Sequence, residues 1–331
     1  MALQVTSPAD IIAAAPTALG FVPEDSVIVF VCSGQRLAAT ARFDWDTAMD
    51  TLPEVAEAVS RRALDDMSVH IVLAPTEPIS HAPHVLQLLA QLREVFAPTD
   101  IDLRSVLMTT GFTTGRWADL ITGEIGTVQD WRTSTAAADA VHVGSTILGS
   151  RQEIVAAMAV LAAVHDGAEL PPTHAVQQIG AALIAGRSVN NPAQLAAALS
   201  PHLNHGALRD LMMGLGTIHP DAAADLFLSM AVHARGDNRA HLLTLVATAA
   251  YVGGSGARTN IAVDESCKHT ANGEPTGMGC LLRLSVQQAL PPRDLADLIR
   301  GGVEVHAVTV EDMAASPNLF KAKVEELLGA A

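Results

Sequence analysis

The chain is short of cysteine and of aromatic residues, and each shortage excludes a class of protein. Only three of its 331 residues are cysteines, too few for a disulfide framework and typical of a reducing compartment. Aromatic residues make up 3% of the chain, so stacking platforms for single-stranded nucleic acid would be hard to build. We therefore expect a cytoplasmic protein that does not bind nucleic acid.

Positive charge and long apolar runs are also scarce. Lys and Arg number 20 against 35 Asp and Glu, and the net charge of −15 repels phosphate backbones and anionic membranes. The longest strongly apolar helical run, residues 154–164, is far too short to span a bilayer. The first ten residues lack the basic and then apolar pattern of a secretory signal. We expect no membrane partner.

Apolar residues, many of them alanine, are abundant. They make up 49% of the chain and give a mean hydropathy of +0.29, which excludes a disordered chain. The length suffices for two domains or one large one.

The first part of the chain alternates strands with helices. Residues 26–32, SVIVFVC, are apolar throughout and predict a strand buried on both faces. Ser33-Gly34 then predicts a tight turn into a strand at 36–43. Further strands are expected at 68–75 and 101–110, with helices at 51–65, where Thr51–Glu54 resembles a capping box, and at 83–96. This spacing predicts right-handed crossovers in a mixed, partly parallel sheet.

From residue 133 onward the pattern is helical. Amphipathic segments separated by Gly and Pro predict helical hairpins up to about residue 300. Residues 303–310, VEVHAVTV, alternate like a half-exposed strand, and a helix is expected at 317–328. The prediction is therefore an α/β (α+β) protein: a mixed-sheet domain at 1–132, an all-α hairpin domain at 133–300 and a strand-helix tail at 301–331. The tail either folds back or pairs with another subunit.

Two acids and a serine precede the first strand, in the stretch ALGFVPEDSVIVF at 18–30. Glu24 and Asp25 suit a catalytic or metal-binding mouth, but they precede the N-terminal end of their strand, whereas ligands of α/β proteins usually bind at carboxyl ends. The other interpretation is an edge cap, in which the acids keep the turn in water and Ser26 satisfies a backbone group. The sequence favours the cap.

The residues just before these acids are expected to be structural. Gly20 and Pro23 set the angle at which the chain enters the strand, and Phe21 fills the layer between helix and sheet. Replacing Phe21 by Ala should therefore cost more stability than replacing Asp25.

The segment GFTTGRWADL, residues 111–120, is the best candidate binding surface because it follows the carboxyl end of a predicted strand. Arg116 can hold an anion, Trp117 can stack on a ring, and Asp119 is close in sequence. The segment lacks the Lys-Ser/Thr pair of a phosphate loop. The alternative is a glycine-bounded hairpin with Trp117 in the core.

Possible metal ligands are few, and no metal site is predicted. Cys267, His269 and Cys280 give only three ligands and no Cys-x-x-Cys pair, so zinc is disfavoured. Two pairs of histidines with helical spacing are explained better by solvated helix ends: His81 with His84, and His202 with His205.

With these residues in view, the chain resembles an actinobacterial family, also present in actinophages, that is described only as a domain of unknown function. The matching pieces run from about residue 5 to about residue 292 and are SPADIIAAAPTALGFVPEDSVIVF, GRWADL, RAHLLTLVATAAYVGGSGARTNIAV and LLRLSVQQALPP. The resemblance implies no activity and no catalytic residues. Here the segment after Trp117, EIGTVQDWRTS, lacks the cysteines usual in such proteins, and the tail after residue 301 is an addition.

Two functions of different classes remain. The sequence favours a non-catalytic scaffold or interaction protein that forms a homo-oligomer and needs no cofactor. The alternative is an enzyme or sensor for a small phosphorylated ligand, held by Arg116, Trp117 and Asp119. In that case Glu24 and Asp25 would act as acid and base or as Mg²⁺ ligands.

Overall fold

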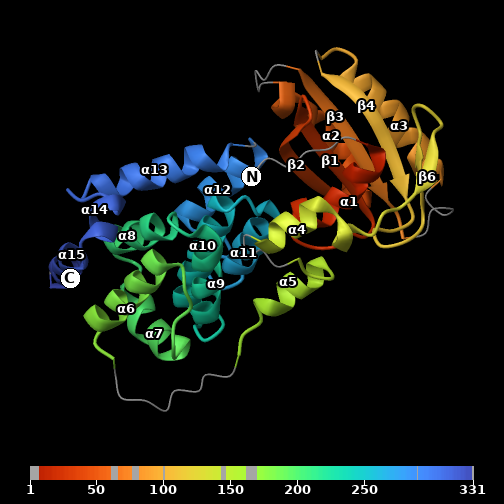
Figure 1. Ribbon diagram of the computed structural model, residues 1–331. Helices are drawn as coiled ribbons and strands as arrows, with labels where there is room; N and C mark the ends of the chain where they lie inside the picture. Colours follow the sequence, from red (N-terminus) through yellow and green to blue (C-terminus); the bar gives the residue numbers. More distant parts are fainter. Residues whose placement is uncertain are drawn as a thin grey trace. The chain divides into compact units, whose positions relative to one another are not determined.

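The computed structural model describes residues 7–60, 66–76, 82–99, 101–142, 147–161, 170–288 and 290–329. The chain forms two compact units, residues 1–153 and residues 154–331, and each is described by itself. The first contains a sheet with helices, and the second is helical throughout its described part (Figure 1). The predicted fold class, a mixed-sheet part followed by a helical part, is confirmed.

The sheet of the first unit has six strands in the order β2-β1-β3-β4-β5-β6. The hairpin of the first two strands is confirmed, and β1 also pairs antiparallel with β3. Only the neighbours β3 and β4 pair in parallel, so the sheet is less parallel than expected. The bounds are β1 (Ser26–Ser33), β2 (Arg36–Asp44), β3 (Met67–Ala74), β4 (Asp102–Thr109), β5 (Arg116–Asp119) and β6 (Ile125–Thr127).

The crossover pattern read from the sequence has a simple origin. Because β2 and β3 are both antiparallel to β1, they are parallel to each other with β1 between them. Helix α2 (Trp45–Ser60) connects these two strands, and α3 (Ala82–Phe96) connects β3 to β4. Each helix thus links two parallel strands, as in a β-α-β unit.

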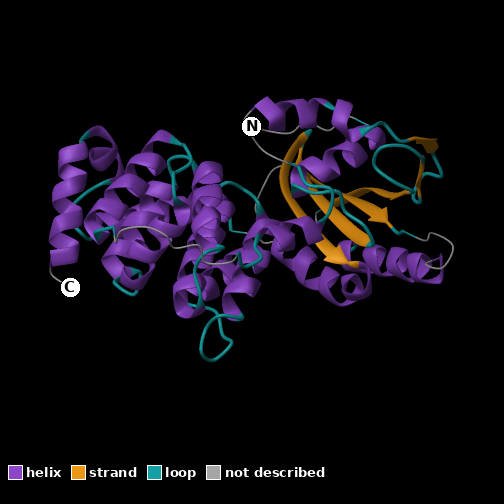
Figure 2. Ribbon diagram, turned by 90° about the horizontal axis from the view of Figure 1, so that it is seen from below, coloured by secondary structure: helices purple, strands orange, loops and turns teal. Residues whose placement is uncertain are grey.

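Helices cover both faces of the sheet (Figures 1 and 2). The face that carries Val27, Val29 and Val31 packs against α2 and α3 in one hydrophobic cluster. Helix α1 (Pro8–Leu19) packs on β2, β3 and β4 and also contacts η1 (Trp131–Thr133) and α4 (Thr135–His142). The heptapeptide at 26–32 is therefore buried from both sides, as its unbroken apolar character predicts.

Helix α2 begins before the expected position. It starts at Trp45, directly after β2, so Thr51 lies inside the helix and the predicted capping box is wrong. The Thr51 hydroxyl donates to the carbonyl of Thr47, one turn earlier, instead of capping. The backbone N–H of Trp45 is held by the Asp25 carbonyl oxygen at 3.0 Å.

The turn that precedes β1 follows directly from the end of α1. Gly20 ends α1 in the left-handed conformation, with φ +79°, and its N–H bonds to the Pro16 carbonyl. Phe21 is 1% exposed and forms an isolated bridge with Leu148, a segment that the sequence does not connect to it. The Leu148 carbonyl accepts from the Val22 N–H, and the Leu148 N–H donates to the Gly20 carbonyl. A segment more than 120 residues later in the chain therefore fixes this turn.

The second unit packs its helices around α10 (Gly236–Val252), which is buried on nearly all sides and contacts α8, α9, α11, α12 and α13. Helix α5 (Arg151–Ala157) crosses the division between the units. The other elements are α6 (Pro172–Ala185), α7 (Pro192–Leu199), η2 (Ser200–His202), α8 (Gly206–Gly216), α9 (Pro220–Ala231), α11 (Gly256–Cys267), α12 (Gly277–Gln287), α13 (Pro292–Glu304), α14 (Val310–Ala315) and α15 (Pro317–Gly329).

The predicted tail strand at 303–310 is wrong. Val303 belongs to α13, and α14 begins at Val310. The burial of the valines does not follow a strand's alternation, since Val303 is buried while Val305, two residues later, is 82% exposed. Packing of α13 and α14 on α8 outweighs the weak strand preference of β-branched residues. The helix expected after it is confirmed as α15.

Candidate functional site at the carboxyl edge of the sheet

Glu24 and Asp25 lie at the edge of the sheet where β3 and β4 end. Ser26 at the start of β1 pairs with Ala74 at the end of β3, because these strands are antiparallel. Leu73 pairs with Met108 near the end of β4, because those strands are parallel. The N-terminal end of β1 therefore coincides with the carboxyl ends of its neighbours. The sequence disfavoured a site here because the acids precede their own strand. Since β1 runs antiparallel to β3, that objection no longer applies.

Asp25 is held in a strained conformation. Its φ is +40°, in the left-handed region that non-glycine residues seldom adopt. One carboxylate oxygen accepts from the backbone N–H of Thr76 at 2.7 Å, and the carbonyl oxygen accepts from Trp45. Asp25 therefore connects the entry of β1 to the exit of β3 and to the start of α2. Backbone strain of this kind concentrates at functional sites, although it also serves tight connections.

Ser26 and Arg42 form a closed network beside these acids. The Ser26 hydroxyl donates to the Glu24 carbonyl oxygen at 2.5 Å and accepts from Arg42 Nε at 2.8 Å. The same guanidinium pairs with Asp44 at 2.6 Å. Ser26 thus satisfies a backbone group, as the edge-cap interpretation predicts. The Glu24 side chain itself is exposed.

Arg116 and Trp117 point to different surroundings on β5. Arg116 is exposed, whereas Trp117 is 7% exposed, as expected for successive residues of a strand. The Trp117 indole N–H donates to the Thr127 carbonyl at 3.2 Å, and the ring packs directly over Gly126 of β6. The hairpin thus uses Trp117 in its own packing, while Arg116 at the carboxyl edge stays accessible.

Asp119 is buried, and its carboxylate organises the turn after β5. One oxygen accepts from the backbone N–H groups of Ile121 and Val106, and the other accepts from the Thr122 hydroxyl at 2.9 Å. These contacts lie within the hairpin or, for Val106, on the adjacent strand β4. Of the three residues proposed for this loop, the structure therefore places only Arg116 toward solvent.

The structure also brings together a pair that the sequence analysis missed. His70 Nδ1 and the Ser105 hydroxyl oxygen lie 2.9 Å apart on adjacent strands, at directly opposed positions. Burial, and secondarily the charge of Arg104, lowers the pKa of His70. Nearby Cys32 and Ser68 are fully buried, and burial raises the pKa of the Cys32 thiol. The only sequence signal was a pair of polar residues two positions apart, Ser68 and His70, in an otherwise apolar strand.

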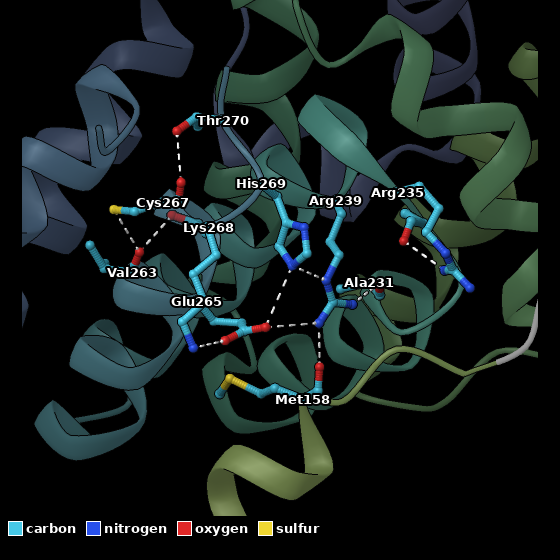
Figure 3. Close-up of polar contacts among 12 residues, drawn as sticks. Met158, Ala231, Arg235, Arg239, Val263, Glu265, Cys267, Lys268, His269 and Thr270 are labelled. Atoms are coloured by element: carbon cyan, nitrogen blue, oxygen red, sulfur yellow. Dashed lines mark hydrogen bonds and ion pairs between the residues drawn. The ribbon is translucent and has the colours of Figure 1, made fainter. Parts of the chain in front are cut away.

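In the second unit, Arg239 is the most deeply buried charge of the described residues (Figure 3). Its guanidinium donates to the carbonyl oxygens of Ala231 and Met158 and, through Nε, to His269 Nε2 at 2.8 Å. Glu265 lies 3.6 Å away. Burial lowers the pKa of Arg239, and Glu265 partly opposes this effect. Arg239 thus joins three separate parts of the helical unit.

Glu265 has a second role in this cluster. It pairs with Lys268 at 2.7 Å and with His269 at 3.5 Å (Figure 3). Burial acts to raise the pKa of Glu265, but the bonds from Lys268 and His269 and the charge of Arg239 leave it below its ordinary value. The carboxylate therefore stays ionised beside the buried guanidinium.

Among the described residues, no group of three or more His, Cys, Asp or Glu side chains could hold a metal ion. His269 bonds to Arg239, and the Cys267 thiol donates to the Val263 carbonyl while Cys280 is exposed. His84 is the third residue of α3, whereas His81 lies outside the described residues. His202 ends η2, and His205 precedes α8.

The chain matches the model of a family described as Domain of unknown function (DUF4192) over residues 8–190 and 172–293. It belongs to this family. Helices α14 and α15 and most of α13 lie beyond the match. Neither the curated proteins nor the solved structures gave a match to the chain.

Within the described part of the chain, none of the helices combines the length and the apolar character that crossing a membrane requires.

Proposed function

We propose that this member of the family is a non-catalytic interaction protein that assembles with copies of itself through strand β2. The supporting observation is the position of β2 at the edge of the sheet. It pairs along its length with β1, and among the described residues no strand pairs with its other side. An edge strand of nine residues presents backbone N–H and C=O groups that a second strand can bind.

The side chains of β2 define which part of the edge is suited to pairing. Ala39, Ala41 and Phe43 pack against the hydrophobic cluster and fix the strand in place. The register with β1 shifts near Ala38, which leaves that residue out of the ladder. Residues 39–44 are therefore the regular part of the edge. Two copies would join antiparallel about a two-fold axis, which is the commonest symmetry of homodimers.

Two proline substitutions test this proposal. Because the N–H groups of successive strand residues point to opposite sides, only one of Thr40→Pro and Ala41→Pro removes an outward N–H. The other substitution removes an N–H that bonds to β1, and that variant is recognised by its lower thermal stability. We expect the variant of near-normal stability to be monomeric by light scattering, while the wild type is dimeric or larger. A wild type that is still monomeric at about 100 micromolar, a concentration that would populate even a weak dimer, would contradict the proposal.

A second candidate is binding of a small phosphorylated ligand at the carboxyl edge, with Mg²⁺ as the possible cofactor. It is supported by the position of Glu24, Asp25 and the loop that leads to Arg116, which all lie at the end of the sheet where β3 and β4 terminate. A thermal-shift screen with nucleotides and Mg²⁺ tests it, since a ligand at 100 times its dissociation constant adds about 2.7 kcal/mol. Equal shifts for wild type and Arg116→Ala would exclude this loop as the site.

We also infer a cytoplasmic location and an actinobacterial or phage source. The sparse cysteines support the first, and the alanine-rich, acidic composition together with the family resemblance supports the second.

A further inference from the structure

We propose that the C-terminal hairpin, residues 310–329 of α14 and α15, exchanges between two copies of the chain. In the exchanged form, the hairpin of each copy docks on α6 and α8 of the other. This inference rests on the proposed self-association but concerns a different surface. It accounts for the segment that extends beyond the family match.

The docking surface is fitted to particular side chains of the hairpin. Gly180 of α6 lies directly under the ring of Phe320, where no Cβ would fit. Gly214 of α8 leaves room for Val303, and a Cβ there would also lie 3.1 Å from Val310 Cγ2. Phe320 and Val310 are 4% and 2% exposed. An occupant must therefore present these same side chains at the same spacing, which a second copy of this chain does.

The connection that would open is strained. Residues 305–309 join α13 to α14, and Ala307 within them has φ +59°. Alanine is disfavoured in this left-handed region because its Cβ approaches the neighbouring carbonyl oxygen. Ala307 is exposed, so its side chain gains no packing in return. Val305 beside it is 82% exposed.

Exchange keeps the docking contacts and removes this strain. In the opened form, α13 and α14 separate, and Ala307 takes an ordinary right-handed or extended conformation. The contacts of Phe320 with Gly180 and of Val310 with Gly214 form again between copies. Short connections under strain favour exchange of this kind. Contacts across the connection oppose it, among them the ion pair of Arg300 with Glu311 at 3.9 Å and the approach of His306 Nε2 to Asp210 at 3.7 Å.

Substitutions of Ala307 shift the equilibrium in opposite directions. Glycine adopts a positive φ without strain, so Ala307→Gly stabilises the closed form. We expect the equilibrium constant for forming the exchanged dimer to fall about thirtyfold, because each of its two connections no longer relieves about 1 kcal/mol of strain. Ala307→Pro cannot adopt a positive φ, so the exchanged dimer should become the main species. Asn191→Gly is the matched control, because Asn191 is also exposed and left-handed, with φ +53°, and precedes α7. It should leave the equilibrium unchanged.

The measurement is light scattering on the full chain after equilibration in mild denaturant, followed by cross-linking. A chain that carries both Gly180→Cys and Phe320→Cys, with the exposed Cys280 replaced by Ser, forms a disulfide within one copy if the hairpin docks on its own chain and between two copies if it is exchanged. Opposite shifts for the two Ala307 variants, together with a disulfide between copies, support exchange. Equal oligomeric states for both variants, or a disulfide within single copies alone, would overturn it. The β2 proline variants keep the two proposals apart, because they leave the hairpin and its docking surface intact.

Discussion

The carboxylate of Asp25 accepts a hydrogen bond from the backbone N–H of Thr76 at 2.7 Å, and so joins the start of one strand to the end of its antiparallel neighbour. Asp25 also has φ +40°. Asp25→Asn keeps an acceptor and should cost least. Asp25→Gly loses the bond but relieves the backbone, whereas Asp25→Ala loses the bond without relieving the backbone and should cost about 1 kcal/mol more than Gly.

Tryptophan fluorescence during urea unfolding measures this series well. All three tryptophans, Trp45, Trp117 and Trp131, lie in the first unit, so the signal reports on that unit alone. An alanine variant as stable as the glycine variant would show that the positive φ carries no cost.

Removing the Phe21 ring should strongly destabilise the first unit. The side chain is 1% exposed and lies at the bridge to Leu148, so Phe21→Ala should cost about 3–5 kcal/mol. Glu24→Ala is the nearby control, because Glu24 is exposed and its loss should change the free energy of unfolding by less than about 0.5 kcal/mol. A larger loss of stability for Glu24→Ala than for Phe21→Ala would show that the acid, and not the buried ring, stabilises this turn.

A methyl group at Gly126 should collide with Trp117. A Cβ there would lie 2.5 Å from Cε2 and Cζ2 of the indole, so Gly126→Ala should cost about 1–3 kcal/mol and shift the tryptophan emission. Ile125→Ala is the control on the same strand, since Ile125 is 62% exposed and its truncation should change stability by less than about 0.5 kcal/mol. Unchanged emission and stability for Gly126→Ala would show that the hairpin can move apart without cost.

The stability of the first unit should fall as the solution is acidified through the histidine range. Burial lowers the pKa of His70 in the folded chain, so the unfolded chain takes up the proton first. The stabilisation is complete above about pH 6.5, the ordinary pKa of histidine, and is lost as the pH falls below it. His70→Asn should flatten this dependence between pH 7.5 and 5.5, measured by tryptophan fluorescence in urea. His142→Asn, at an exposed position of the same unit, should leave it unchanged.

Arg239 should be far costlier to remove alone than together with its partner. Arg239→Met removes the donor to His269 and to two carbonyl groups, and leaves Glu265 without its buried cationic partner, so it should cost about 3–5 kcal/mol in the helical unit. Adding Glu265→Gln removes the carboxylate charge that faced the guanidinium, so the double variant should be more stable than the sum of the single losses. Hydrogen exchange of the α10 amides follows this unit. Strict additivity would show that the ion pair makes no contribution.

Much of the local structure was predictable from short stretches of sequence. The unbroken apolar run at 26–32 predicts a strand buried on both faces, and its central residues are fully buried. The Ser33-Gly34 turn predicts the hairpin that follows. Where prediction failed, a distant contact decided. Thr51 has the pattern of a helix start, yet α2 already begins at Trp45, whose N–H is held by Asp25.

By itself, the sequence determined the four longer strands of the sheet, the helices between them and the helical character of the later part of the chain. It could do so because hydrophobic periodicity and turn residues act over a few positions. Only the tertiary structure decided that β1 runs antiparallel to β3, that Trp117 and Asp119 are used inside their own hairpin, and that the valines at 303–310 end one helix and begin another. These features depend on packing between residues far apart in the chain, which no local pattern records.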